Sequence, residues 1–573
     1  MTAEEHHAPV NDTTLFYRAW PMPDAKKAVI LVHRGHEHSG RLIDVVDHLG
    51  LTGAAFFAWD ARGHGQSPGD RGYAPSFSQI VKDLDAFVRY VSAQHGFAIE
   101  DMIVLGHSVG AVTVASWVHD FAPPIRAMVL VTPALRVKLY VPFARTGLKL
   151  LQAMRGGKKM YVQSYVKPTM LTHDKEQAQR YADDPLITRA IAVNVLLDLY
   201  EISERIVADA GAIRVPALVL SGGADWVVDV KEQRKFFDRL GSTHKKMRVF
   251  DGMYHDLLHE AGRAEVLAEI RAFIDEVHEP RESLVGAHRD GYTKREYDTL
   301  ARPASAMKNA AFAVQRLSLS TVGKLSRGIR LGWESGFDSG RSLDYVYENE
   351  ARGALGVGKL IDRTYLDSIG WKGIRQRKLN LEKALRSAID RTSGDARILD
   401  VATGCGRYVL DVLKDSAGTA LLRDFTPANV EQGRGIARTM GLANRVTFEQ
   451  GDAFDEESLA SITPAPNVVI VSGLYELFGD NDMVLRSLRG IARAMTGGGH
   501  LIYTGQPWHP QLEMIARVLT NRDGKPWVMR RRTQEEMDDL VRAAGFSKLD
   551  MEIDRWGIFT VALATVAQRT AGI

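Results

Sequence analysis

The stretch Met102-Ile103-Val104-Leu105-Gly106-His107-Ser108-Val109-Gly110 decides the fold of the first half of the chain. Four apolar residues, typical of a buried parallel strand, run into a Gly-x-Ser-x-Gly turn, and a helical pattern follows over 111–119. Glycine on both sides allows a tight strand-to-helix turn from which the Ser108 hydroxyl projects above a sheet. The backbone N–H of the next residue then faces the oxygen that becomes negative when an ester is attacked. We therefore predict an α/β fold with Ser108 as a nucleophile.

The length and composition set the outer limits of the function. A chain of 573 residues exceeds what one hydrophobic core organises, so two large α/β domains are expected. The formal net charge of +3 gives no sign of a nucleic-acid partner, and the single cysteine, Cys405, excludes an intramolecular disulfide. Residues 1–9 lack the apolar core of a signal peptide, and no run has the length of a membrane-spanning helix. We expect a cytoplasmic protein; its oligomeric state is not readable, and no metal site is predicted.

Two parts of the chain alternate short apolar runs with helical patterns, which predicts sheets covered by helices on both faces. The predicted strands are Lys27–His33, Ala54–Trp59, Met102–Gly106, Ala127–Thr132, Ala217–Ser221 and Met247–Phe250, then Arg397–Val401, Ala420–Phe425, Val446–Gln450, Asn467–Val471, His500–Thr504, Lys548–Ile553 and Phe559–Ala564. Residues 134–210 show only helical patterns and predict an inserted helical cap. We place the boundary at residues 279–281, expect domains over 1–280 and 396–573, and assign 281–395 to a helical linker or to the N-terminal part of the second domain.

A serine nucleophile needs a base that an acid holds in place, and in this fold the chain order is serine, acid, histidine. Asp225 follows the predicted strand Ala217–Ser221, and His255 follows the strand Met247–Phe250. Ligands of open α/β sheets bind at such strand ends. Asp229 and His259, each four residues further on, remain alternative choices for the acid and the base.

Two further segments, His33–Arg41 (HRGHEHSGR) and Asp60–Ser67 (DARGHGQS), complete a resemblance to the monoacylglycerol lipase and lysophospholipase branch of the α/β-hydrolases, of the serine aminopeptidase S33 type. The resemblance implies a carboxylester hydrolase that acts on lipid-like esters through Ser108, Asp225 and His255. It also implies an oxyanion hole formed by the N–H groups of Gly35 and Val109. The sequence departs from many relatives at Arg34, where they have glycine.

The predicted cap is basic and apolar. Residues 121–173 contain no Asp or Glu. They contain the basic residues Arg126, Arg136, Lys138, Arg145, Lys149, Arg155, Lys158, Lys159 and Lys167, interleaved with Leu139, Tyr140, Val141, Phe143, Leu148, Leu150, Leu151 and Met154. This pattern favours contact with an anionic lipid surface or an anionic amphiphile. The alternative is a solvated lid whose apolar face packs on the hydrolase body.

A second glycine-rich turn lies in Ile398–Arg407 (ILDVATGCGR), between a predicted strand and a helix. Its backbone allows close approach of a nucleoside, and the helix N-terminus suits a carboxylate such as that of a methionine moiety. No Lys-Ser/Thr pair follows, which excludes a P-loop, and Val409 stands where the dinucleotide fingerprint needs a third glycine or alanine. Asp424, Asp452 and Ser472 close the next three strands.

This half resembles the class I S-adenosylmethionine-dependent methyltransferases, which have a Rossmann-like fold. The resemblance implies S-adenosylmethionine as the cofactor, bound by Gly404, Gly406, Asp424, Asp452 and Ser472, with Asp400 supporting the turn. The two halves together are similar to a bacterial class of bifunctional hydrolase–methyltransferase chains. A doubly wound domain that binds another nucleotide, or none, remains the alternative.

The methyl acceptor is not readable from the sequence. Tyr475 and Glu476 after the fourth strand, and residues 506–511 (QPWHPQ) after the fifth, either line an acceptor pocket or only shape loops. Cys405 is expected to pack within the glycine loop. The acid-free segment 299–333 carries Val314, Leu317, Val322, Leu325 and Ile329 near helical spacing, and we expect it to dock on a domain or to add to a membrane-facing surface.

The favoured hypothesis is therefore a bifunctional enzyme, a hydrolase of monoacylglycerol-like or lysophospholipid-like esters joined to a methyltransferase. Two alternatives stay open. In the first, another alcohol replaces water and the N-terminal half is an acyltransferase. In the second, a non-catalytic lipid-binding hydrolase domain serves an active methyltransferase.

Overall fold

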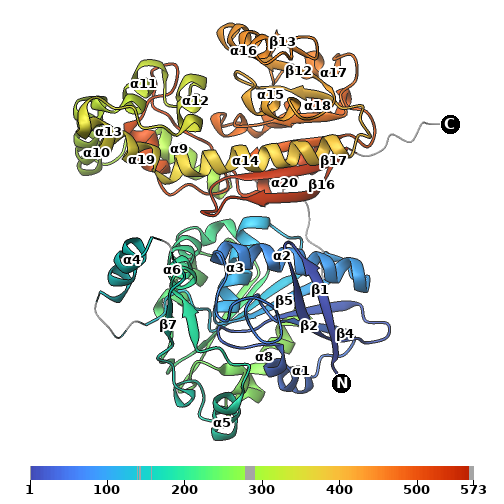
Figure 1. Cartoon of the computed structure of the whole chain (residues 1–573). Helices are drawn as coiled ribbons and strands as arrows, with labels where there is room; N and C mark the ends of the chain where they lie inside the picture. Colours follow the sequence, from blue (N-terminus) through green and yellow to red (C-terminus); the bar gives the residue numbers. More distant parts are fainter. Residues whose placement is uncertain (1, 139, 141–142, 157, 278–290, 567–573) are drawn as a thin grey trace, which may run out of the picture. The chain divides into compact units, whose positions relative to one another are not determined.

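The computed structural model describes residues 2–138, 140, 143–156, 158–277 and 291–566. The chain divides into two compact units, Met1–Glu282 and Ser283–Ile573 (Figure 1). The predicted boundary at residues 279–281 lies outside the described residues.

The first unit is built on an eight-stranded sheet (Figure 1). The strands, in spatial order, are β1 (Glu4–Val10), β2 (Thr13–Trp20), β4 (Ala54–Trp59), β3 (Lys27–Val32), β5 (Met102–His107), β6 (Ala127–Val131), β9 (Ala217–Gly222) and β10 (Lys245–Phe250). β1 and β2 are antiparallel to their neighbours, whereas the pairs from β4 to β10 are parallel. This is the predicted α/β-hydrolase fold. The sequence prediction missed β1 and β2, because polar side chains such as Glu4, His6 and Thr13 break the apolar pattern there.

Helices cover both faces of this sheet. They are α1 (Ile43–Leu49), α2 (Phe77–His95), α3 (Val109–Phe121), α7 (Val230–Arg239) and α8 (Arg263–Glu276). Val29 and Leu31 of β3 belong to the core cluster that α1 and α8 close, whereas Ala28 and Ile30 are equally buried outside that cluster. Burial on both faces explains the unbroken apolar runs, since each large aliphatic side chain contributes ~1.5–3 kcal/mol when fully buried.

The cap is inserted between β6 and β9, as predicted. Its elements are α4 (Ala144–Met154), β7 (Tyr161–Gln163), α5 (Lys175–Asp183), β8 (Ala190–Ala192) and α6 (Val193–Ala208). The expectation of an all-helical cap is wrong, because β7 and β8 pair as a small antiparallel ribbon. Strands of three residues are too short to produce a period that the sequence would reveal.

The second unit contains a seven-stranded sheet. In spatial order its strands are β13 (Val446–Gln450), β12 (Thr419–Asp424), β11 (Arg397–Asp400), β14 (Val468–Val471), β15 (His500–Gly505), β17 (Thr560–Val566) and β16 (Phe546–Ile553). The pairs from β13 to β15 are parallel, and β17 is antiparallel to both neighbours. This arrangement is the expected Rossmann-like methyltransferase fold, with all seven predicted strands present.

The helices of this sheet are α14 (Ile369–Asp390), α15 (Arg407–Leu413), α16 (Pro427–Thr439), α17 (Glu456–Ala460), α18 (Asn481–Ala494) and α20 (Gln534–Ala543). Leu381 and Leu385 of α14 join α15 and α16 in the core cluster against β11 and β12. Thr426 occupies the predicted N-cap position of α16, with Pro427 in the first turn.

The segment before β11 folds with a late helix into a separate helical layer. Its members are α9 (Tyr292–Ala301), α10 (Ala306–Ser320), α11 (Arg327–Ser335), α12 (Gly340–Glu348), α13 (Leu355–Leu366) and α19 (Leu512–Val518). A second core cluster joins Phe337, Tyr345 and Leu366 to Trp371 and Ile515. The region 291–395 is therefore part of the second unit rather than a bare linker.

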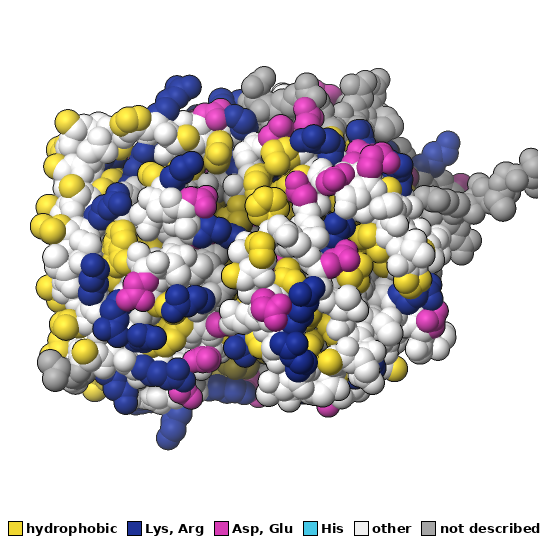
Figure 2. Space-filling model, turned by 90° about the horizontal axis from the view of Figure 1, so that it is seen from above, with side chains coloured by type: hydrophobic (Ala, Val, Ile, Leu, Met, Phe, Trp, Pro, Cys, Tyr) yellow, Lys and Arg dark blue, Asp and Glu magenta, His cyan; other side chains and the backbone are white. Residues whose placement is uncertain are grey.

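The predicted apolar stripe from Val314 to Ile329 does not form one helix. It is divided among α10, the 3-10 turn Val322–Leu325 and α11, because Thr321 leaves helical geometry at ψ −91°. Val314, Leu317 and Val322 are exposed within their unit, and only Ile329 is buried. On the face shown in Figure 2, hydrophobic and basic side chains alternate toward the left, the side on which α10 to α13 lie in Figure 1. Among the described residues, no helix is both long and apolar enough to cross a bilayer.

Candidate active sites

Ser108 lies in a strained turn between β5 and α3. Its φ of 56° and ψ of −112° are conformations that a residue with a side chain rarely adopts. A Cβ on Gly106 would lie 2.6 Å from the Gly110 carbonyl oxygen, and a Cβ on Gly110 would lie 2.4 Å from the His33 carbonyl oxygen. Both motif glycines are therefore required by close backbone contacts. The Ser108 N–H donates to the Val131 carbonyl at 2.8 Å and fixes the turn to β6.

The structure brings the three predicted catalytic side chains together. His255 Nε2 lies 2.8 Å from Ser108 Oγ, and His255 Nδ1 lies 2.8 Å from Asp225 Oδ2. All three residues are at most 5% exposed. If Nδ1–H donates to the carboxylate, Nε2 is free to accept the serine proton, which is the arrangement that activates a serine nucleophile.

Asp225 is held as an anion. Its Oδ1 accepts hydrogen bonds from the N–H groups of Val227 at 2.7 Å and Val228 at 2.9 Å. Burial by itself raises the pKa of this carboxyl, but the facing His255 and the two backbone donors outweigh burial, and the pKa lies below its ordinary value. Asp225 is therefore charged throughout the range in which an imidazole titrates, and an imidazolium at His255 would be stabilised.

The two alternative residues are engaged elsewhere. Asp229 caps α7, where its Oδ1 accepts from the Lys231 N–H at 2.9 Å. His259 Nδ1 lies 2.9 Å from Asp256 Oδ1, and its Nε2 lies 2.9 Å from the Arg41 carbonyl oxygen. Among the described residues, neither forms a hydrogen bond with Ser108 or His255, so the geometry favours Asp225 and His255.

The predicted oxyanion residues lie next to each other. A Cβ on Gly35 would lie 3.0 Å from Val109 Cγ2. Val109 is the first residue of α3, so its N–H has no acceptor within the helix. Arg34 is only 4% exposed; its Nη2 lies 2.9 Å from Glu37 Oε1 and its guanidinium stacks over Tyr181 of α5. Arg34, the residue that departs from the relatives, therefore belongs to a buried cluster of charged side chains and connects the oxyanion loop to α5 of the cap.

The cap helix α4 presents its apolar residues outward. No residue of α4 is buried within the described part of the unit, and Phe143, Leu150 and Met154 are exposed by 86%, 63% and 75%. Of the three leucines of α4 only Leu148 is half-buried, so most of the apolar side of the helix does not pack on the hydrolase body. The acid-free segment 121–173 is less basic in the folded unit than its sequence suggests, because Glu204 and Glu201 of the neighbouring helix α6 pair with Arg145 and Lys149. Leu139 and Val141 of the predicted pattern lie outside the described residues.

In the second unit, the glycine turn lies between β11 and α15. Gly404 has φ +58°, with no atom within 4 Å of a Cβ placed on it, and Gly406 has φ +72°. Asp400 is fully buried; its Oδ1 accepts from the Ala402 N–H at 3.2 Å and its Oδ2 from the Tyr408 hydroxyl. Asp400 thus hydrogen-bonds to the backbone of the turn. Cys405 is buried and the pKa of its thiol is raised by burial to about 11, which fits packing rather than nucleophilic chemistry.

The other predicted cofactor residues lie at the same edge of the sheet, since parallel strands share their carboxyl ends. Asp424 ends β12, Asp452 follows β13 and is exposed, and Ser472 follows β14. Asp424 accepts from the Gly404 N–H at 2.8 Å, the Thr426 N–H at 2.9 Å and Asn429 Nδ2 at 3.0 Å. A carboxylate has about four acceptor positions, so about one remains on Asp424 for a ligand hydroxyl. Gly404 leaves open space beside this acid.

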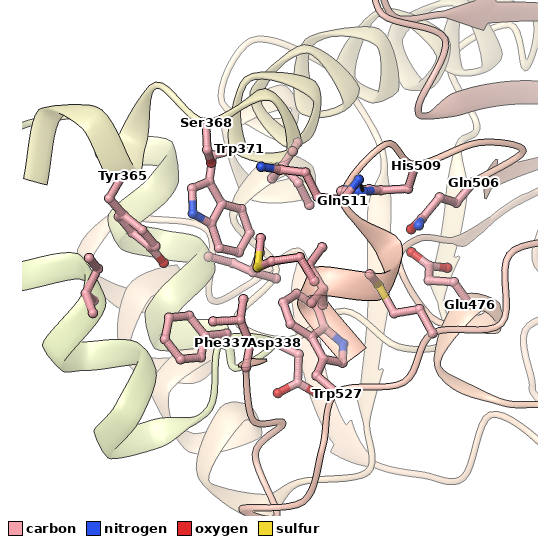
Figure 3. A pocket seen from close by; sticks show the side chains of 18 of the residues that line it. Phe337, Asp338, Tyr365, Ser368, Trp371, Glu476, Gln506, His509, Gln511 and Trp527 are labelled. Atoms are coloured by element: carbon pink, nitrogen blue, oxygen red, sulfur yellow. Dashed lines mark hydrogen bonds between the residues drawn. The ribbon is translucent and has the colours of Figure 1, made fainter. Parts of the chain in front are cut away.

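A pocket of about 470 Å³ opens at this end of the second unit (Figure 3). Of the predicted acceptor residues, Glu476, Gln506, His509 and Gln511 line it. Tyr475 instead is buried with its hydroxyl 3.0 Å from Ser487 Oγ, and Trp508 packs against the helical core cluster. The remaining lining is mostly aromatic and aliphatic, and it includes Phe337, Tyr365, Trp371, Ile374, Met514 and Trp527.

Sequence reasoning missed these aromatic residues. Phe337 and Tyr365 come from the helical layer, Trp371 from the start of α14, and Trp527 from the loop after α19. These segments carry no motif and meet only in the folded chain. Arg377 was missed as well; it lies in α14, pairs with Glu476 at 3.2 Å and stacks over Phe559. The sequence shows Arg377 only as one of several basic residues in a helical pattern, and its burial appears only in the fold.

Comparison with known proteins follows the division into two units. A family described as "Putative methyltransferase" matches residues 270–566. The chain belongs to this methyltransferase family. A second family, described as "Serine aminopeptidase, S33", matches residues 23–262 of the same chain.

The relatives of this chain differ in how much of it they match. The uncharacterized protein YnbC of Escherichia coli is 48% identical over 98% of each chain. The monoacylglycerol lipase of Mycolicibacterium smegmatis is 28% identical and covers 48% of this chain and 97% of its own. The crystal structure of Paleococcus ferrophilus monoacylglycerol lipase is 27% identical, covers 46% of this chain and 99% of its own, and has a TM-score of 0.42. The chain thus joins a lipase-like hydrolase unit to a methyltransferase unit.

Proposed function

We propose that the first unit is a serine carboxylester hydrolase. The observation that carries this proposal is the chain of hydrogen bonds from Ser108 Oγ through His255 to the anionic Asp225. Ser108 Oγ attacks the ester carbonyl while its proton passes to His255 Nε2, and the N–H groups of Gly35 and Val109 donate to the oxyanion. The C–O bond then breaks as His255 returns the proton to the leaving alcohol. Water, deprotonated by His255, releases the acyl group as a carboxylic acid and regenerates Ser108.

The substrates that we propose are monoacylglycerol-like or lysophospholipid-like esters. Support comes from relatives that cover this half and are named monoacylglycerol lipase, monoglyceride lipase and phospholipase. Exposed apolar side chains on α4 suit the approach of a substrate that sits in a lipid phase.

A fluorophosphonate probe, which reacts with activated serines, tests the serine mechanism. We expect labelling of the wild type and of Cys405→Ala, and none of Ser108→Ala. Wild-type chain that stays unlabelled while folded would overturn the proposal, and labelling that persists in Ser108→Ala would move the nucleophile elsewhere.

For the second unit we propose S-adenosylmethionine-dependent methyl transfer. Gly404 and Gly406 would receive the nucleoside and methionine parts, Asp424 a ribose hydroxyl and Asp452 the adenine amino group, with Ser472 beside them. When bound, the sulfonium supplies an electrophilic methyl group. The protein's own contribution is to hold an acceptor at the end of β14, because proximity and orientation account for much of such a reaction.

Calorimetric titration of S-adenosylmethionine tests the cofactor. We expect binding by the wild type, at least tenfold weaker binding by Asp424→Ala, and unchanged binding by Asp415→Ala, which removes an exposed carboxylate after α15. A wild-type chain that binds no S-adenosylmethionine would remove the cofactor proposal.

We also propose that α4 contacts anionic lipid surfaces. Phe143, Leu150 and Met154 supply the apolar part, and Arg155 and Lys158 supply charge beside them. Vesicle flotation should recover the chain with phosphatidylglycerol vesicles more than with phosphatidylcholine vesicles. Phe143→Ser with Leu150→Ser should abolish recovery, whereas Leu379→Ser, which removes an exposed leucine of α14, should not. Equal absence from both vesicle types would exclude the contact.

A further inference from the structure

The pocket of the second unit has a polar end and an apolar end. In Figure 3, Glu476, Gln506 and His509 lie on one side, and Tyr365, Trp371 and Phe337 lie on the other. Gly473 and Glu476 follow β14, and Gln506 follows β15. β14 pairs in parallel with both β11 and β15, so the polar end of the pocket lies at the same sheet edge as the Gly404 turn. The apolar end points away from that edge, into the helical layer.

The pocket lining contains buried donors without partners, and its polar end has no net charge. Gln506 is 3% exposed, and its Nε2 has no hydrogen-bond partner among the described residues. The Nε1 of Trp527, also in the lining, is buried without a partner in the same described part of the chain. Arg377 and Glu476 neutralise each other. Buried N–H donors without acceptors are costly, so they point to a ligand that brings oxygen acceptors.

His509 adds a further N–H donor to the lining. Its Nδ1 accepts from the Gln511 N–H at 3.1 Å, so the neutral ring carries its proton on Nε2. Burial lowers the pKa of His509 to about 4, which keeps the ring neutral near pH 7. The Nε2 atom lies 3.0 Å from a Cβ placed on Gly370, a residue of the pocket lining.

From this geometry we infer that the pocket binds an acyl chain with an oxygen-bearing head. The chain lies among Trp371, Ile374, Trp527 and Phe337, and the head accepts hydrogen bonds from Gln506 Nε2 at the end that adjoins the Gly404 turn. A volume of about 470 Å³ is in the range of sites that enclose such small molecules. A fatty acid and its glycerol monoester share this chemistry, and a fatty acid is also what the proposed hydrolase releases. The function of this binding rests on the proposed methyl transfer, whereas the binding itself does not depend on it.

Photolabelling locates such a ligand without depending on catalysis. The full-length Ser108→Ala chain, which leaves esters intact, is exposed in separate arms to a diazirine-bearing palmitic acid and to its glycerol monoester, and labelled peptides are mapped. We expect label on peptides around 361–377 and 506–529 in at least one arm, competed by the unmodified compound. Label from the acid arm alone identifies a carboxylic acid ligand, and label from the ester arm alone identifies the monoester. Label confined to residues 1–277 in both arms overturns the inference.

Two variants and a control test the position of the ligand. Ile374→Trp fills the apolar end and should lower labelling of these peptides at least tenfold. Gln506→Leu removes the donor and should lower it about fivefold. Leu379→Trp, which adds the same bulk to the exposed face of α14, should stay within twofold of the parent. Labelling of Ile374→Trp and Gln506→Leu equal to that of the parent overturns the inference. If Ile374→Trp unfolds, Gln506→Leu decides alone, because it adds no bulk.

S-adenosylmethionine binding, measured on the same chains, separates this inference from the proposed function. Intact cofactor binding without acyl label in the second unit removes the acyl pocket alone. Acyl label without cofactor binding removes the methyl transfer alone.

Discussion

His255 Nε2 lies 2.8 Å from Ser108 Oγ, although 147 positions separate the two residues in the sequence. Each is delivered by its own strand end, Ser108 by β5 and His255 by the loop after β10. His255 also accepts at its carbonyl oxygen from Thr132 Oγ1 at 3.0 Å, which ties its loop to the end of β6. The sheet between these strands therefore sets the distance between base and nucleophile.

Asp225→Asn is expected to lower kcat by ~10³–10⁴ with little change in KM, because an amide at this position favours the wrong tautomer of His255. Hydrolysis of a short p-nitrophenyl ester gives the rate constants. Asp229→Asn, which alters only the cap of α7, should remain within about twofold of wild type. An equal loss in both variants would contradict the assignment of Asp225.

Ser108→Gly is expected to be more stable than Ser108→Ala by ~1 kcal/mol. Glycine adopts φ 56° without strain, which outweighs its greater entropy loss on folding, whereas alanine retains the strain that serine has. Urea unfolding of the first unit within the full chain measures the difference. An Ala variant as stable as the Gly variant would show that the turn stores no strain.

Arg34→Met is expected to destabilise the first unit by ~3–5 kcal/mol, since the removal of one partner leaves buried carboxylates unpaired. Against the opposing effect of burial, the Arg34 guanidinium helps to hold the pKa of Glu37 at about 2, and Asp256 lies 3.5 Å from Arg34 Nη2. Thermal unfolding at pH 7 checks this. Arg180→Met, which breaks an exposed pair with Glu176 on α5, is the matched control and should change little.

Asp400 is expected to make the second unit less stable as the pH rises. Burial raises the pKa of this carboxyl from 3.8 to about 7. The folded state therefore holds the proton more tightly than the unfolded chain, and stability is fully present below about pH 4 and falls until about pH 7. The total loss is about 4 kcal/mol.

Asp400→Asn imitates the protonated acid, so the pH slope that Asp400 contributes should disappear from its unfolding curves. Calorimetric scans at pH 5 and pH 8 on the wild type and the variant measure it. A slope that is equal in both proteins would assign the pH dependence to other groups.

The sequence sufficed for features that a local pattern encodes. The Gly-x-Ser-x-Gly turn is confirmed, with Ser108 at a positive φ and both glycines in close contact with backbone atoms. The predicted parallel strands β3, β4, β5, β6 and β9 are confirmed. They were readable because a strand that is buried on both faces has an unbroken apolar sequence. The roles of Ser108, Asp225 and His255 stay proposals, supported by their distances.

Other features were not readable because their physical cause is not local. β1 begins with polar residues and β2 with two threonines, and β7 and β8 are too short for any period. The cap seemed strongly basic because its acidic partners, Glu201 and Glu204, lie on a different helix. The apolar residues from Val314 to Ile329 keep a helical spacing in the sequence although the helix breaks at Thr321. Spacing alone does not show such a break.

The sequence by itself determined two α/β units, a serine on a strand-to-helix turn and a glycine turn beside three acidic or polar strand ends. These follow from short-range patterns, since burial and backbone sterics act over a few residues. Only the tertiary structure decided that His255 rather than His259 faces Ser108, and that Trp371 and Trp527 close an apolar pocket behind Gln506. Contacts between distant segments depend on how the strands order and the helices pack, and no single stretch of the chain contains that information.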